Sequence, residues 1–285
     1  MSGFVKPNDV PDEFLINTGQ QRLIYNDKHP YYEVMPRDIN LASMNFNLPI
    51  PATPTAKLVG PLKGKVNINK LIPLELKEWG IEATTNKKVF EFLKTPVKFT
   101  KTNVEGDFFH SPRKSEVVLN VGGKRWGASK YFQKQVVNHE VGHAVHTQLN
   151  IIDTVKKNIS PEYKKHFSKL KKLIKGKEAQ INTDLWKIYR SSFSKSDAAL
   201  LVEFKTGNYR DVQEMAGNAM DALQALTNSR YGAGHPVSYM NKAAKKEAEM
   251  FAHSMENFLD GNPVFKKIMP EVYEESIKFV GSIKK

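Results

Sequence analysis

The sequence predicts an α+β fold in which a small sheet precedes a mostly helical C-terminal half. Three strand-like segments lie between residues 97 and 121, and a nearly continuous series of helical patterns follows them. Of the 285 residues, 40% are hydrophobic and 26% are charged, so the chain can bury a core. This composition excludes wholesale disorder and a collagen-like or coiled-coil rod. No apolar run is long enough to span a membrane.

Residues 1–66 are predicted to form an irregular, proline-rich N-terminal extension. This segment holds eight of the 15 prolines. Proline removes a backbone donor and fixes φ, so we expect the segment to loop or extend. Residues 67–285 are expected to form one domain.

Within residues 67–285 the first elements follow from local patterns. Short helices are expected at 71–80 and 87–93, and strands at 97–102 and 107–110. The strongest strand pattern spans 116–121 and ends at a Gly-Gly pair. We expect this strand to be the sheet edge along which an extended peptide would lie.

The later helices are placed by their N-caps and by apolar periodicity. Ser129 is expected to cap a helix that runs to about residue 149, and Ser160 one that runs to about 175. One face of this second helix is apolar and consists of Tyr163, Phe167, Leu170 and Ile174. Further helices are expected at 184–194, 196–205, 211–227, 242–259 and 270–283.

A motif with metal-binding chemistry lies in the helix after Ser129 and reads His139-Glu140-Val141-Gly142-His143. His139 and His143 are one helical turn apart, so both imidazoles can reach a single ion. Glu140 can then reach a water at that ion and act as a general base. At this composition roughly 0.02 chance matches to the motif are expected in such a chain. The sequence therefore predicts one zinc ion bound through His139 and His143.

Zinc in a catalytic site needs a third protein ligand and an open position for water. The chain has no cysteine, so the ligand must be His, Asp or Glu. The residues alone leave the choice open among Glu203, Asp211, Glu214, Asp221, Glu247, Glu249, His253 and Glu256.

Two segments resemble the catalytic domain of the anthrax lethal-factor-like zinc peptidases. The helix around His139 is similar to their His-Glu-Phe-Gly-His-Ala-Val pattern, and residues 246–255 resemble their third-ligand helix, Glu-Ala-Glu-Phe-Phe-Ala-Glu. The resemblance implies a zincin-like metallopeptidase domain with Glu249 as the third metal ligand. It also implies that Tyr239 is the active-site tyrosine that stabilises an oxyanion. An ordinary half-buried tyrosine is the alternative.

The chain departs from that family in several places. The segment from His143 to Glu249 is longer, which implies a helical insertion at about 150–231, and Tyr239 lies farther before Glu249. His146 stands where the family often has an acidic residue, which bears on the support of the zinc histidines. His235 lies near Tyr239 and is either a second donor or a plain loop histidine.

A second resemblance is to the zincin-like C-terminal regions of tailed-phage minor head proteins. It is carried by the segments 112–120, 221–227, 232–239, 249–253 and 269–273. The leading expectation is a zinc-dependent endopeptidase that hydrolyses a peptide or protein substrate. The alternative is a structural virion protein that retains the zincin fold, contacts other virion proteins and cleaves little.

The chain is basic, with a formal net charge of +13. Such a surface favours nucleic acid, anionic lipid or an acidic partner. Nine lysines and one acid, Glu162, lie between residues 156 and 177, and a solvated helix face is the simpler interpretation. A third possibility is a nucleic-acid-packaging component that uses this basic face. Without a base-reading motif, we expect weak, non-specific nucleic-acid binding at most. The N-terminus has no secretory pattern, so we expect a virion-associated or cytoplasmic protein, with export by another route left open.

Overall fold

The computed structural model describes residues 73–79, 86–104, 108–194 and 197–283, together with three short N-terminal strands. The chain divides into two units, Met1–Lys57 and Leu58–Lys285. In the first unit, β1 (Phe4–Val5), β2 (Gln21–Tyr25) and β3 (Tyr32–Pro36) form an antiparallel sheet in the order β1-β3-β2. Most of residues 1–66 lies outside the described residues, so the predicted extension stays a prediction.

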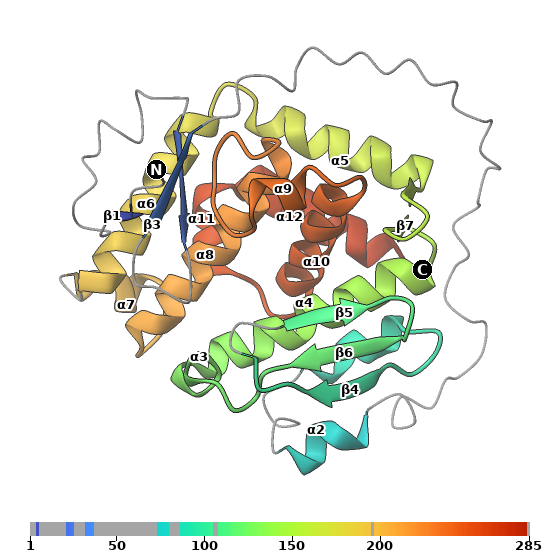
Figure 1. Cartoon of the computed structure of the whole chain (residues 1–285). Helices are drawn as coiled ribbons and strands as arrows, with labels where there is room; N and C mark the ends of the chain where they lie inside the picture. Colours follow the sequence, from blue (N-terminus) through green and yellow to red (C-terminus); the bar gives the residue numbers. More distant parts are fainter. Residues whose placement is uncertain are drawn as a thin grey trace. The chain divides into compact units, whose positions relative to one another are not determined.

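The second unit has an α+β fold with a small mixed sheet, as the sequence predicts (Figure 1). Its strands are β4 (Lys98–Lys101), β5 (Phe108–Ser111) and β6 (Glu116–Leu119), in the order β4-β6-β5. β4 runs parallel to β6, and β5 runs antiparallel to it.

The prediction that the strand at 116–121 forms the sheet edge is wrong. β6 is the central strand because both of its sides are paired, and its apolar residues Val117, Val118 and Leu119 are buried. Among the described strands, β5 lies at the edge of this sheet on the side away from β4.

The helices of the second unit follow the predicted order, with differences of detail. The segment at 87–92 is a 3₁₀ helix. The sequence does not predict the short helices Lys124–Ala128, Val237–Met240 and Pro263–Ile268, nor the hairpin formed by Ile152–Asp153 and Asn158–Ile159. The elements are α2 (Leu74–Glu78), η4 (Lys87–Phe92), α3 (Lys124–Ala128), α4 (Lys130–Gln148), β7 (Ile152–Asp153), β8 (Asn158–Ile159), α5 (Pro161–Ile174), α6 (Glu178–Ser194), α7 (Ala199–Glu203), α8 (Tyr209–Leu226), α9 (Val237–Met240), α10 (Lys245–Leu259), α11 (Pro263–Ile268) and α12 (Pro270–Ile283).

Helix α4 occupies the centre of the unit, with the sheet on one side and helices α8 and α10 on the other (Figure 1). Ser129 caps it as predicted, because the Ser129 hydroxyl accepts a 2.9 Å hydrogen bond from the Phe132 amide. The same hydroxyl donates to Asp211 at 2.6 Å and so fixes the start of α4 to α8. No helix in the described part of the chain is long and apolar enough to cross a bilayer.

Helix α10 packs against α4 in the opposite direction. Asp260, after the end of α10, contacts Lys134 and Asn138 early in α4, whereas Glu249, near its start, contacts His143 later in α4. A Cβ placed on Gly142 would lie 3.2 Å from the Ala252 Cα atom. The glycine therefore lets the two helix backbones approach closely at the level of the histidines.

Candidate metal centre

Three donor atoms from α4 and α10 lie together at this crossing. His139 Nε2 is 3.1 Å from Glu249 Oε2 and 3.2 Å from His143 Nε2, and His143 Nε2 is 3.4 Å from Glu249 Oε2. Tetrahedral zinc with bonds of about 2.0–2.1 Å holds its ligand atoms roughly 3.3 Å apart. The spacing therefore fits one such ion held by the two predicted histidines and Glu249.

The imidazole of His139 is oriented by Glu256. Its Nδ1 atom lies 2.5 Å from Glu256 Oε1, and Asn218 donates to the other carboxylate oxygen at 3.0 Å. Burial would raise the pKa of Glu256, but His253 and His139 lower it to about 2. An ionised carboxylate only accepts hydrogen bonds, so Nδ1 of His139 carries a proton. Burial would lower the pKa of His139, but Glu249 and Glu256 raise it well above its usual value, so Nε2 would release its proton on binding an ion.

The imidazole of His143 is oriented by His146, through a short chain of hydrogen bonds. His146 Nδ1 lies 2.7 Å from the Ile152 carbonyl, which can only accept. His146 Nε2 is then the acceptor for His143 Nδ1 at 3.1 Å. Burial lowers the pKa of His146 well below its usual value, so its ring is neutral. A neutral histidine therefore orients the ring of His143, whereas a carboxylate orients that of His139.

Tyr239 on α9 holds the second oxygen of Glu249. Its hydroxyl donates to Glu249 Oε1 at 2.6 Å, which leaves Oε2 facing the histidines. Burial would raise the pKa of Glu249, but His143 and His235 lower it well below its usual value. Burial and Glu249 raise the pKa of Tyr239, so the phenol keeps its proton. Tyr239 therefore lies at the site and donates to the candidate ligand.

A cavity of about 230 Å³ opens beside these donor atoms. Glu140 lines it and is only 6% exposed, and within the described residues its carboxylate makes no hydrogen bond or ion pair. Burial raises the pKa of Glu140. A buried carboxylate that faces a cavity next to a metal-type donor set is well placed to accept a proton. The other lining residues are Phe108, Phe109, His110, Pro112, His139, His143, His146, Thr147, Thr154, His235, Tyr239, Lys245 and Glu249.

His110 on β5 reaches this cavity although the sequence analysis did not single it out. Burial, with smaller effects from His143 and Lys245, lowers the pKa of His110 to about 3. The ring is therefore neutral and able to donate or accept one hydrogen bond. A histidine within a strand of four residues has no spacing signal that would mark it in the sequence.

The other candidate ligands lie elsewhere or have different partners. Glu214 forms ion pairs with Arg125 at 3.1 Å and with Arg210 at 2.7 Å, and Glu203 pairs with Lys267. Asp221 approaches His253 and His235 rather than the two motif histidines.

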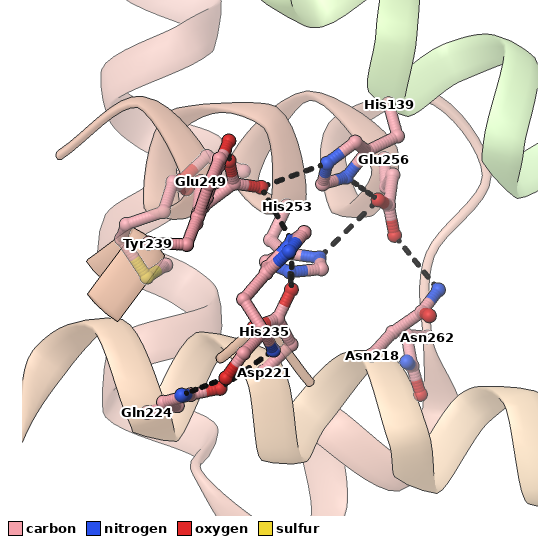
Figure 2. Close-up of polar contacts among 12 residues, drawn as sticks. His139, Asn218, Asp221, Gln224, His235, Tyr239, Glu249, His253, Glu256 and Asn262 are labelled. Atoms are coloured by element: carbon pink, nitrogen blue, oxygen red, sulfur yellow. Dashed lines mark hydrogen bonds and ion pairs between the residues drawn. The ribbon is translucent and has the colours of Figure 1, made fainter. Parts of the chain in front are cut away.

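His253 and Glu256 extend the site along α10. Figure 2 shows His253 between Asp221 and Glu256; His253 Nε2 is 3.1 Å from Asp221 Oδ2. Glu249, His253 and Glu256 have the spacing of one helix face, a signal that the sequence contains. Two further groups in the described part of the chain also bring donor atoms within 4.8 Å, namely His139 with His253 and Glu256, and Asp221 with His235 and Glu249.

Within the described residues, the arrangement combines two oriented imidazoles, one carboxylate that could hold an ion with them, and the carboxylate of Glu140, which faces a cavity without a hydrogen-bond partner. Two histidines and a glutamate with an open position form a typical catalytic zinc donor set. The interpretation depends on this geometry, because comparisons with protein-family models, curated proteins and solved structures find no significant match to the chain.

Proposed function

We propose that this chain is a zinc-dependent endopeptidase of the zincin type. The observation that supports it most directly is the triangle of donor atoms with sides of 3.1, 3.2 and 3.4 Å, next to the unpaired carboxylate of Glu140. A purely structural role does not require a buried carboxylate with no partner, because burying such a group costs stability.

The chain's own residues divide the work of peptide hydrolysis. His139, His143 and Glu249 would hold the ion, which lowers the pKa of a water and polarises the carbonyl when bound. Glu140 accepts the proton of the attacking water and later passes it to the leaving amine. Tyr239 keeps Glu249 in place and lines the cavity in which the carbonyl oxygen becomes charged.

The substrate backbone would lie along β5. This strand is unpaired on one side within the described sheet, and its residues Phe108, Phe109 and His110 line the cavity. An extended peptide can pair with such an edge through main-chain hydrogen bonds. Phe109 is 45% exposed at this edge and would offer a contact for a substrate side chain.

The test combines metal analysis with peptide digestion. Purified protein should hold about one zinc per chain after dialysis, and it should cleave members of a peptide library. A chelator should abolish the cleavage, and added zinc should restore it. Glu140→Gln keeps the shape of the side chain but removes the base, so zinc content should persist while the rate falls by about 10²–10⁴.

The outcomes distinguish an endopeptidase from a structural virion protein that retains this fold. Cleavage by Glu140→Gln at the parent rate would contradict the mechanism. Zinc bound by a parent protein that cleaves no peptide would favour the structural virion role. Full zinc occupancy in Glu249→Ala would show that a residue other than Glu249 is the third ligand.

A further inference from the structure

The backbone of His235 is held in place by the buried side chain of Gln224. Gln224 on α8 is fully buried, and its amide donates to the His235 carbonyl at 2.7 Å. The Gln224 carbonyl oxygen accepts from the His235 amide at 3.0 Å. Figure 2 shows this pair below the site. A loop residue with both backbone groups bound in this way has a defined position.

Two glycines bring the loop that carries His235 directly onto α8. Gly232 has a φ of +81°, and a Cβ there would lie 2.2 Å from the Met220 carbonyl oxygen. A Cβ on Gly234 would lie 2.3 Å from Asp221 Oδ1. No side chain fits at either position, so the Gly-Ala-Gly-His sequence places His235 beside Asp221.

The His235 side chain lies between two carboxylates and faces the cavity. Its Nε2 atom is 3.4 Å from Asp221 Oδ2 and 3.4 Å from Glu249 Oε2. Its ring stacks on that of Tyr239 with centroids 4.5 Å apart. The side chain is 35% exposed and lines the same cavity as Glu140, whereas that of Asp221 is 11% exposed.

The Nε2–H group of His235 is shared between the two carboxylates, because it lies at the same distance from both. Carboxylates only accept, so a nitrogen that faces two of them carries a proton. Both separations exceed the 2.7–3.2 Å of a normal N–H···O hydrogen bond. A donor so placed, partly exposed in a cavity, is available to a third acceptor.

We propose that Asp221 and His235 form an oxyanion-binding arm of this site, which rests on the proposed function. As the water oxygen bonds to the scissile carbonyl carbon, its proton passes to Glu140 and the carbonyl π electrons move onto the carbonyl oxygen. His235 donates its Nε2–H to that oxygen. Asp221 is a positioning residue that holds the ring beside Tyr239.

Inorganic phosphate, a tetrahedral oxyanion, is the probe that tests this arm apart from catalysis. Its affinity is measured by visible absorption titration of the protein loaded with Co²⁺ in place of zinc. His235→Ala should keep the parent's metal content and weaken phosphate binding by at least about tenfold. Loss of one oxyanion donor should lower kcat by about 10²–10³, with KM nearly unchanged. His235→Gln, which keeps an N–H donor, should recover part of both, and Asp221→Asn should weaken phosphate binding with the metal retained.

The matched control is His166→Gln, which removes a buried histidine on α5 that contacts Glu275 and lies outside the cavity. It should leave phosphate affinity and kcat at the parent values. Unchanged phosphate affinity in metal-loaded His235→Ala would overturn the proposal. Loss of metal in that variant, or two metal ions per parent chain that fall to one, would make His235 a metal ligand instead. A parent that binds no zinc would overturn the proposed function, and this inference with it.

Discussion

The two candidate histidine ligands are held by chemically different partners. His139 donates to the ionised carboxylate of Glu256, whereas His143 donates to the neutral ring of His146. A carboxylate partner makes an imidazole a stronger ligand, and a neutral partner does so less. The two ligands are therefore not equivalent, and the ion should depend more on the partner of His139.

Glu256→Gln should weaken metal retention without removing a ligand. The amide keeps the size of the side chain but carries no charge, so His139 loses both its fixed tautomer and its stronger basicity. We expect zinc affinity to fall by about 10–100-fold. Competition with a chromophoric chelator measures this change directly.

Glu274→Gln is the matched control, since the Glu274 side chain is 58% exposed and pairs with Lys266 at the surface. Its zinc affinity should equal that of the parent. Equal affinities for Glu256→Gln and Glu274→Gln would show that Glu256 does not tune the site.

The sequence predicts the motif residues of the site better than their supports. His139, Glu140 and His143 are marked by a fixed spacing within one helix. The pairing of His139 with Glu256 depends on how α10 packs on α4, which no local pattern encodes. His143 and His146 are three residues apart on one helix, a spacing that the sequence shows, and only their rotamers had to be seen in the structure. No sequence pattern distinguishes Asn218 and Gln224 from other polar residues of α8. Only the packing of α8 beside the site shows their role.

At the scale of elements, the site depends on the close crossing of α4 and α10 at Gly142. A Cβ there would lie 3.2 Å from the Ala252 Cα atom and 3.3 Å from the Met255 Cβ atom. The first neighbour is backbone and cannot rotate away, so the two helices would have to separate. Separation would pull Glu249 away from His139 and His143.

Gly142→Ala should therefore destabilise the protein although alanine favours helix. The gain in helix propensity is about 1 kcal/mol, and overpacking a tight contact costs about 1–3 kcal/mol. We expect the free energy of unfolding to fall by roughly 1 kcal/mol, with weaker zinc binding, as measured by urea titration and chelator competition.

Gly217→Ala on α8 is the control, because nothing lies within 4 Å of a Cβ at that position. Here only the propensity gain remains, so stability should rise by about 0.5–1 kcal/mol. A similar gain in the free energy of unfolding of Gly142→Ala would show that α4 and α10 can move apart at little cost.

Elements with strong local signals were predicted well, and those set by tertiary pairing were not. The helix at 270–283 has the predicted bounds, and the caps of α4 and α5 are confirmed. The prediction that β6 lies at the sheet edge is wrong because strand order depends on which strands pair. The sequence of a single strand does not contain that information. The two-residue strands β7 and β8 are too short to show alternation.

At the scale of the molecule, the positive charge is concentrated in part on α5. Its apolar face is buried as predicted, while Lys164, Lys165, Lys172 and Lys175 are exposed. This confirms the predicted orientation of the helix.

Reversal of these four lysines to glutamate tests the nucleic-acid alternative. We expect the parent to bind duplex DNA weakly, with a log–log salt slope of about 0.9 for each phosphate contacted, and the variant to lose this binding. Zinc content and peptide cleavage should not change. Fluorescence anisotropy over a salt series provides the measurement.

The control reverses four exposed lysines that are scattered along the chain, namely Lys114, Lys130, Lys187 and Lys278. It makes the same change of net charge without altering α5. Equal loss of binding in both variants would assign the effect to total charge. Tight binding at physiological salt, abolished only by the α5 reversals, would make nucleic-acid packaging the leading role.

The donor atoms of His139 and Glu249 meet although 110 residues separate them in the chain. An ion shared between them would act as a cross-link that closes this long loop, which contains helices α5 to α8. The unfolded chain holds no such site, so the free energy of binding becomes free energy of folding. Metal uptake would therefore report the integrity of the whole second unit. A destabilising substitution in α6, which is distant in sequence from every candidate ligand, should therefore lower the protein's apparent affinity for the ion.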